Sequence, residues 1–186
     1  NPQYTNNIQI AHTFKYKYTT TISYSYINDF FAQVTEADGE SRNFITTRNV
    51  ADQEIINLGL SYPFNLKEWW SVYLSVNAFR SKYIATDSDF VSLTQETVSF
   101  YGQNNFTLPK GFNLEVSGWF SSPSVWGGTY QTESLGSLDL AIQKKFLSDK
   151  LTTRIAFTDV LYTTPWTGST EFANVSIKGN GGNDSR

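Results

Sequence analysis

The chain has 186 residues, a formal net charge of -3 and a pI near 5.1, with no basic stripe that would favour nucleic acid as a partner. It has no cysteine, which excludes disulfides, Cys-ligated zinc and thiol nucleophiles. No run approaches the roughly 18 consecutive apolar residues of a spanning helix, so a membrane interpretation has to rest on strands.

The composition favours an all-β protein. Aromatic residues make up 16% of the chain, mostly Tyr and Phe, and no window of useful length has the periodicity of an amphipathic helix. The length suits about eight strands, which is enough to close a small barrel. We therefore expect an antiparallel up-and-down meander of about eight strands over residues 1–178, as a single domain, with a loop or tail at residues 179–186.

The predicted strands follow one another as hairpins with short and long connections in turn. Strands 8–14 and 19–26 turn tightly at residues 15–17, and a long polar connection, 28–52, follows. Strands 56–62 and 70–79 turn at residues 63–68, before a long connection at 80–89. Strands 97–108 and 112–120 turn at residues 109–111, before a connection at 121–133. Strands 136–146 and 151–157 turn at residues 147–150, before a connection at 163–170 and a last run, 172–177, without a partner.

One face of these strands is apolar and the other is polar. In the run 70–79, Trp70, Val72 and Leu74 alternate with Ser71 and Tyr73, and this period of two continues along the run. The polar face holds mainly Ser, Asn, Gly and Thr, which suits a wet barrel lumen. Alternation alone leaves a soluble sandwich or barrel open, because a soluble core also needs one dry face.

Aromatic residues gather beside the short turns, as in the girdle of a membrane barrel, where amphipathic rings lie at the level of the headgroups. These residues are Phe14, Tyr16, Tyr18, Tyr62, Phe64, Trp69, Trp70, Phe106, Phe112 and Phe146. Long loops are expected at the opposite end. The asymmetry predicts part of an outer-membrane β-barrel in the bacterial cell outer membrane, with Lys15, Asn65, Lys110 and Asp149 on the periplasmic side.

Three motifs in the second half of the chain carry a family resemblance. They are Leu108-Pro109-Lys110-Gly111, Lys145-Phe146-Leu147 and Thr158-Asp159-Val160-Leu161. This part of the chain resembles the C-terminal barrel of TonB-dependent receptors, particularly the type common in Bacteroidota. The resemblance implies a strand set from a barrel of about 22 strands, whose separate plug domain fills the lumen and contacts TonB. We expect the plug to lie outside this chain, which would be roughly a third of such a receptor.

The leading hypothesis is therefore a fragment of a TonB-dependent outer-membrane receptor that imports a nutrient such as a siderophore or glycan, and not an enzyme. Its expected partners are outer-membrane lipid, the remainder of the parent barrel and its plug domain, and TonB through that plug alone. Two alternatives stay open. One is a soluble lipocalin-like eight-stranded barrel that binds a small apolar ligand, and the other is a small structural outer-membrane barrel.

No residue pattern indicates a catalytic, cofactor or metal site. His12 is the sole histidine and falls on the same face as Ile10 and Phe14, where the role of an interfacial aromatic is favoured over a metal ligand or a triad member. The acidic loop residues lack the spacing of an EF-hand and are interpreted as solvated charge; they are Glu36, Asp38, Glu40, Asp87 and Asp89.

The candidate ligand contacts are Trp126 and Tyr130, in a predicted loop of small residues. They could stack on a sugar or an aromatic siderophore at the outer mouth, and packing against an adjacent loop or lipid headgroups is equally compatible with the sequence. Asp159 is expected beyond the apolar band, hydrogen-bonded to a neighbouring strand. In isolation the edge strands and the apolar face would meet water, so we expect the sheet to curl with its apolar side inward or to pair with another copy.

Overall fold

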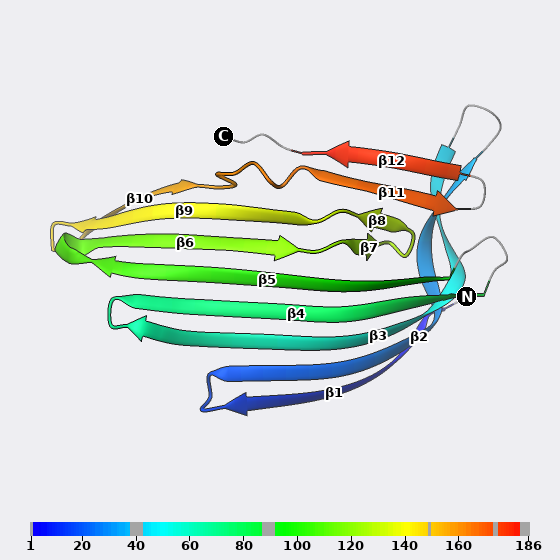
Figure 1. The fold of residues 1–186 in the computed structure, drawn as a ribbon, viewed down its shortest axis with the longest axis horizontal. Coiled ribbons are helices and arrows are strands. Elements are labelled where there is room, and N and C mark those ends of the chain that lie inside the picture. The colour runs from blue at the N-terminus through cyan, green and yellow to red at the C-terminus, as the bar shows by residue number, and fades with distance from the viewer. Residues whose placement is uncertain (1, 38–42, 87–91, 149, 173–174, 183–186) are drawn as a thin grey trace.

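The computed structural model describes residues 2–37, 43–86, 92–148, 150–172 and 175–182. It confirms the all-β prediction, because these residues form twelve strands and one 3₁₀ turn, η1 (Pro109–Gly111). No helix in this part of the chain is long and apolar enough to cross a membrane. The strands form two antiparallel sheets (Figure 1).

Eight strands form the main sheet, which we call the wall. It confirms the predicted meander, because neighbouring strands follow the order β1-β2-β3-β4-β5-β6-β9-β10. The strands are β1 (Tyr4–Phe14), β2 (Tyr18–Ala37), β3 (Asn43–Lys67), β4 (Trp70–Ala85), β5 (Leu93–Leu108), β6 (Phe112–Ser121), β9 (Leu135–Phe146) and β10 (Leu151–Phe157). The four short turns lie at one end of the wall (Figure 1).

The register of the wall keeps the apolar residues on one face. Ile10, Ile22, Leu58, Ala78 and Val98 are direct partners across five neighbouring strands. Because successive side chains of a strand point to opposite faces, a slip of one residue in any pair would send these side chains to the polar side. The alternation in the sequence therefore specifies the pairing.

Two of the short turns use left-handed backbone at ordinary residues. Lys15 and Tyr16 have φ of 49° and 56°, and Leu147 and Ser148 have φ of 53° and 52°. Lys15 and Tyr16 are the central residues of a turn that the Lys17 N–H closes on the Phe14 carbonyl, and a primed hairpin turn requires positive φ at both. The predicted turn positions are confirmed, although neither turn has the Asn-Gly or Asp-Gly pair that normally marks this geometry.

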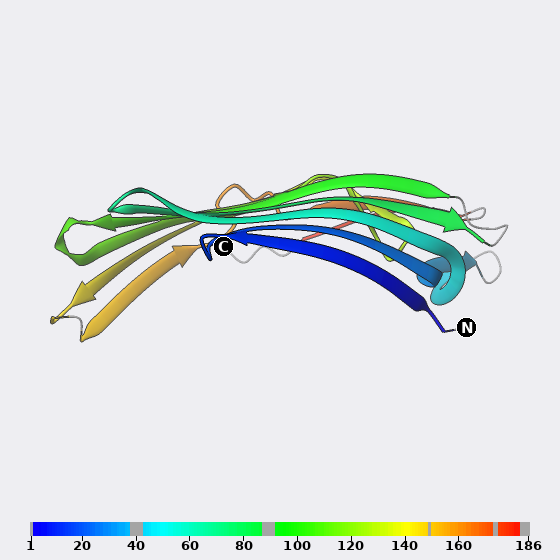
Figure 2. The same cartoon turned by 90° about the horizontal axis from the view of Figure 1, so that it is seen from below.

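The wall is open at both edges. β1 and β10 each have a single neighbour in the sheet, and every residue of both strands is exposed. Figure 2 shows the wall as an arch, with β1 and β10 displaced toward its concave side. The apolar face is exposed, so the expectation that the sheet curls with its apolar side inward is wrong. Pairing with another copy stays a prediction.

A second sheet of four strands lies at the long-loop end, in the order β12-β11-β8-β7. Its strands are β7 (Ser124–Trp126), β8 (Tyr130–Thr132), β11 (Trp166–Phe172) and β12 (Val175–Gly181). The predicted connections 121–133 and 163–170 therefore contain strands, which corrects the sequence-based expectation. The run 172–177 was expected to be one unpartnered strand, but it spans the end of β11 and the start of β12, which pair with each other.

The largest correction concerns residues 28–52, which the sequence predicts as a long polar connection. β2 and β3 instead stay paired from Phe30↔Ala51 to Ala37↔Asn43. β4 likewise extends to Ala85, into the predicted connection 80–89. We call residues 30–37 and 43–51 the crossing hairpin, because they bend toward the concave side of the wall (Figure 2). The sequence places the tip of this connection at residues 37–40, of which Ala37 ends β2 and residues 38–40 lie outside the described residues.

Candidate functional site

The apolar face of the wall is a broad surface of exposed aliphatic and aromatic side chains. Its exposed large residues include Ile8, Ile10, Ile22, Ile56, Leu58, Leu74, Val98, Phe100, Phe120, Ile142, Ile155 and Phe157. A contiguous apolar surface on this scale marks contact with lipid or with another protein. Its residues come from all eight strands, so it belongs to the sheet as a whole.

The height of the apolar face is close to that of the apolar band of a transmembrane β-barrel. On β4 it runs from Trp70 to Ala78, after which Arg80 and Lys82 occupy the same face. Eight steps of about 3.3 Å give about 26 Å along the strand. At a strand tilt of about 40° this becomes about 20 Å of height, near the apolar band of a transmembrane barrel. Arg80 pairs with Glu96 on β5 at 3.9 Å, which places charge at the long-loop edge of the band.

Asn104 is a polar side chain on the apolar face, and its amide oxygen accepts a hydrogen bond from the neighbouring strand. Asn104 alternates with the apolar residues of β5, and the indole Nε1–H of Trp70 donates to its Oδ1 at 3.0 Å. An unpaired amide in hydrocarbon would cost several kcal/mol. The neighbouring strand therefore supplies the hydrogen bond that lipid cannot.

The opposite, concave face of the wall is polar and its side chains bond to one another. Ser61 and Tyr73 share a hydrogen bond of 3.1 Å between neighbouring strands. The hydroxyl of Tyr101 donates to Gln103 at 3.1 Å. Near the short turns, Arg154 on β10 reaches across to Glu115 on β6 at 3.3 Å. These groups suit contact with water or with a polar protein surface, as the sequence predicts for a lumen.

The crossing hairpin is set at its angle by a bend in β2. The pairing of β2 with β3 shifts between Ile27 and Phe30, where Asp29 has a φ of 54°. Asp52 on β3 holds this bulge, because its Oδ1 accepts from the backbone N–H of Asp29 at 3.0 Å and its Oδ2 accepts from the Tyr26 hydroxyl at 3.1 Å. Such bulges redirect strands near sheet edges. The bend sends the hairpin over the concave side.

The crossing hairpin joins opposite parts of the long-loop end. The backbone N–H of Gln33 donates to the carbonyl of Gly127 at 2.8 Å, and the Thr129 hydroxyl donates to the carbonyl of Gln33 at 2.6 Å. β2 also contacts β12, and Figure 1 shows the hairpin crossing behind the ends of β11 and β12. The crossing hairpin therefore connects β2 of the wall to the second sheet.

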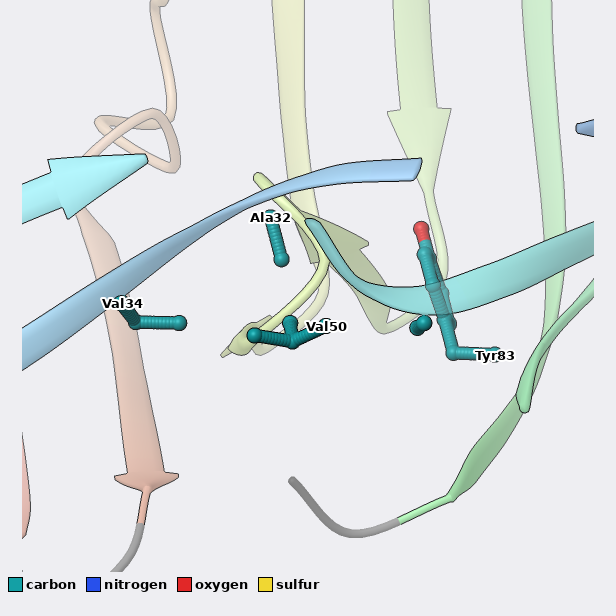
Figure 3. Close-up of a cluster of buried hydrophobic side chains, with 5 residues drawn as sticks. Ala32, Val34, Val50 and Tyr83 are labelled. Atoms are coloured by element: carbon teal, nitrogen blue, oxygen red, sulfur yellow. The ribbon is translucent and has the colours of Figure 1, made fainter. Parts of the chain in front are cut away.

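The buried apolar cluster of the described residues lies beneath this hairpin. Ala32, Val34, Val50, Ala51 and Tyr83 form it, with Phe30, Ala85, Leu93 and Val125 packed around them. Figure 3 shows the side chains of Ala32, Val34, Val50 and Tyr83, which come from β2, β3 and β4. Tyr83 and Phe30 bring their ring centroids to 5.4 Å. The hairpin thus has a core of its own, outside the apolar band.

A hollow of about 280 Å³ lies between the second sheet and the start of β5. Its lining has five residues with polar side chains beside one leucine and one glycine: Ser92, Leu93, Gly128, Thr129, Gln131, Ser169 and Glu171. Gln131 and Ser169 are direct partners across β8 and β11. This set could not be predicted from the sequence, because its members come from three segments, 92–93, 128–131 and 169–171, that meet only in the folded chain.

The two candidate ligand contacts, Trp126 and Tyr130, differ in their surroundings: Trp126 is exposed and Tyr130 packs within the second sheet. Trp126 and Tyr130 are partners across the β7–β8 hairpin, and Trp126 is 65% exposed. Tyr130 packs edge-on against Trp166 with centroids 6.0 Å apart, and its hydroxyl donates to the Gly168 carbonyl at 2.8 Å. Tyr130 therefore holds the second sheet together, while Trp126 remains a free aromatic surface at the long-loop end.

His12 and Asp159, the other residues considered in the sequence, make local structural contacts. His12 lies on the outward face of β1, beside Phe14 and Tyr62 in a shallow aromatic hollow. Asp159 bonds to the neighbouring strand as expected, since its N–H donates to Asp139 on β9 at 2.8 Å.

The Asp159 carboxylate holds the turn after β10. It accepts hydrogen bonds from the hydroxyl and N–H groups of Thr163 and Thr164. The Thr164 hydroxyl is the main cause of a lowered pKa at Asp159. Among the described residues there is no group of three or more metal-ligating side chains, and Asp38, Glu40, Asp87 and Asp89 lie outside them.

Aromatic residues beside the short turns pack into two groups. Trp69, Trp70 and Phe106 bring their centroids within 5.3 to 6.2 Å of one another. Phe14 and Tyr18 lie 6.4 Å apart, and Tyr18 lies 5.5 Å from Tyr62. The predicted gathering of rings at this end is therefore present in three dimensions.

Comparison with known proteins gives one match. Residues 1–186 match the family described as "Outer membrane protein beta-barrel family". No curated protein and no solved structure matches the chain.

Proposed function

Because the chain belongs to the outer membrane protein beta-barrel family, and so lies in the bacterial outer membrane, we propose that its wall is a sector of a TonB-dependent receptor barrel that imports a nutrient such as a siderophore or glycan. The observation that carries the proposal is the open wall. A lipid-facing sheet with two free edges is a building part of a larger barrel, and its long-loop end offers a recognition surface.

The free edges need partners in a membrane. A backbone N–H or C=O without a partner costs several kcal/mol in hydrocarbon, so spanning sheets close on themselves. β1 and β10 each leave one side unpaired, and they are not neighbours in the sheet. On the proposed function, further strands of the parent barrel pair with both edges.

The polar concave face suits the lumen of such a receptor. Large barrels of this kind contain a plug, and the contacts between wall and plug are made between polar surfaces. The Arg154–Glu115 pair and the amides of Gln103 and Asn105 present both donors and acceptors there. TonB would act through that plug and not through the wall.

The long-loop end supports a role in recognition. The hollow lined by Gln131, Ser169 and Glu171 and the exposed Trp126 lie on the second sheet and its β7–β8 turn, which are tied to the crossing hairpin. The proposal assigns no catalysis to the chain, whose one histidine, His12, faces outward among aromatic residues. The family match replaces the soluble lipocalin-like alternative with a membrane protein.

Energised uptake tests the proposal. In cells that make the complete protein, import of a bound ligand is expected to fall to background when a protonophore collapses the inner-membrane proton gradient, or when TonB is deleted. Trp126→Ala should weaken ligand binding about fivefold, the loss of one aromatic contact of about 1 kcal/mol, while Trp69→Ala at the opposite end should leave affinity unchanged. Uptake at an undiminished rate without the gradient would refute the receptor and favour a passive or structural barrel.

A further inference from the structure

The short-turn end of the wall carries a concentration of lysine. The segments 14–18, 64–70, 108–112 and 144–151 contain seven of the fourteen cationic residues of the chain but only two of its seventeen acidic residues. The lysines are Lys15, Lys17, Lys67, Lys110, Lys144, Lys145 and Lys150. Every short turn contributes at least one, and Figure 1 places all four turns at the same end. We call these seven lysines the belt; all four short turns contribute to it.

Among the described residues, none of these lysines forms an ion pair with an acidic side chain. Six of them are exposed and Lys144 is half-buried. Within the described part of the chain, ion pairs are formed by Arg80 and Arg154, and none by a lysine of the short-turn end. Their charge is thus available to a ligand outside the chain.

The belt adjoins the apolar band and its aromatic rings. The Lys144 ammonium lies 4.2 Å from the ring centre of Phe112 and 4.9 Å from that of Phe146, and Lys15 lies 5.2 Å from Phe14. Lysine stems cover apolar surface while the ammonium stays at the polar boundary. The lysines therefore lie at the depth where the headgroups of a bilayer begin.

The remainder of the chain has the opposite charge, with seven cationic and fifteen acidic residues. On the apolar face at the far edge of the band, Arg80 is neutralised by Glu96. The positive charge therefore belongs to one membrane surface and not to the protein as a whole.

We propose that the short-turn end is a binding surface for anionic glycerophospholipid headgroups in the leaflet that the short turns meet. Unpaired ammonium groups attract lipid phosphates at a membrane surface, and each lysine that reaches the surface favours an anionic lipid by up to about fivefold. The packed rings of Trp69, Trp70 and Phe106 fix the depth of the wall, and the lysines select the lipid around it.

Lipid retention tests the inference. The complete protein is released from nanodiscs containing equal phosphatidylglycerol and phosphatidylcholine, and native mass spectrometry counts the lipids that stay bound. We expect phosphatidylglycerol to exceed phosphatidylcholine about fivefold at 20 mM salt, a selectivity that falls toward one at about 500 mM because salt screens the attraction. In a variant with Lys15, Lys17, Lys110 and Lys150 each changed to Gln, three lysines of this end remain, and the ratio at low salt should fall toward one.

Two controls separate charge from folding and from position. Changing the same four lysines to Arg keeps the charge and should keep the selectivity, and Lys82→Gln, at the opposite end of the apolar face, should leave it unchanged. Heat-modified mobility on gels confirms that each variant is folded. Equal retention of both lipids by the native protein, or undiminished selectivity in the Gln variant or its loss in the Lys82→Gln variant, overturns the inference.

Discussion

The bend of β2 at Asp29 depends on one carboxylate, and its removal should loosen the crossing hairpin without unfolding the wall. Asp52 accepts from the Asp29 N–H at 3.0 Å and from the Tyr26 hydroxyl at 3.1 Å, and both bonds are part-buried. Hydrogen bonds to a charged group contribute about 1.5 to 3 kcal/mol, and partial exposure reduces each to about 1 kcal/mol here. Asp52→Ala should therefore cost about 2 kcal/mol of local stability, and Asp52→Asn about half of that.

Hydrogen–deuterium exchange of the complete protein measures this change. A loss of about 2 kcal/mol lowers the protection of amides in residues 31–37 and 43–51 by about 30-fold, while β5 keeps its protection. Glu54→Gln is the matched control on the same strand, because Glu54 accepts a single exposed bond from Tyr24 at 3.1 Å and holds no backbone group. Its expected effect is about twofold or less. Unchanged protection in Asp52→Ala, or a loss spread equally over β5, would refute this account of the bend.

Three further substitutions test the long-loop end. Gly128→Ala should displace the crossing hairpin and lower the free energy of urea unfolding by about 1–3 kcal/mol. Gly128 has a φ of 85°, and a Cβ added there would lie 2.6 Å from the Phe30 ring. Gly102→Ala is the control, because a Cβ added at Gly102 would have no other atom within 4 Å. Val50→Thr buries a hydroxyl in the apolar cluster and should cost about 1–3 kcal/mol by the same assay. The ionised Asp159 carboxylate, whose pKa is lowered mainly by the hydrogen bond from the Thr164 hydroxyl, stabilises its turn above about pH 4. This stabilisation is lost as the pH falls through the folded-state pKa of Asp159. Asp159→Asn should therefore remove the acid dependence from thermal unfolding curves.

The sequence was sufficient to predict the wall because the wall is built from local rules. Period-two alternation assigns each residue of β4 to a face of the sheet. In each hairpin, the short turn determines which residues of the two strands pair. Ile22 and Leu58 could be assigned to the apolar face without knowledge of their partnership, since each strand repeats the same pattern. The aromatic rings at the short turns follow from the same reasoning.

The long-loop end could not be predicted, because its contacts join residues distant in sequence. The bend at Asp29 needs Asp52, which reaches it only after β2 and β3 have paired. Tyr130 finds Trp166 through a second sheet whose strands are three to seven residues long. Short strands with polar faces give little periodic signal, so residues 121–133 and 163–170 have the composition of loops. The candidate role of Trp126 as a ligand contact stays a prediction.

The distribution of apolar residues reflects the two solvents that the chain meets. Inside the band, lipid covers one face of the wall and the other is polar, so Leu58 and Val98 can be dry without packing against a core. Beyond the band, water reaches both sides, and apolar residues gain only by packing on one another. This is why Val34 and Val50 are fully buried although many large apolar residues of the wall are exposed. The buried cluster thus lies where the membrane ends, and it gives the crossing hairpin a stability that does not depend on lipid.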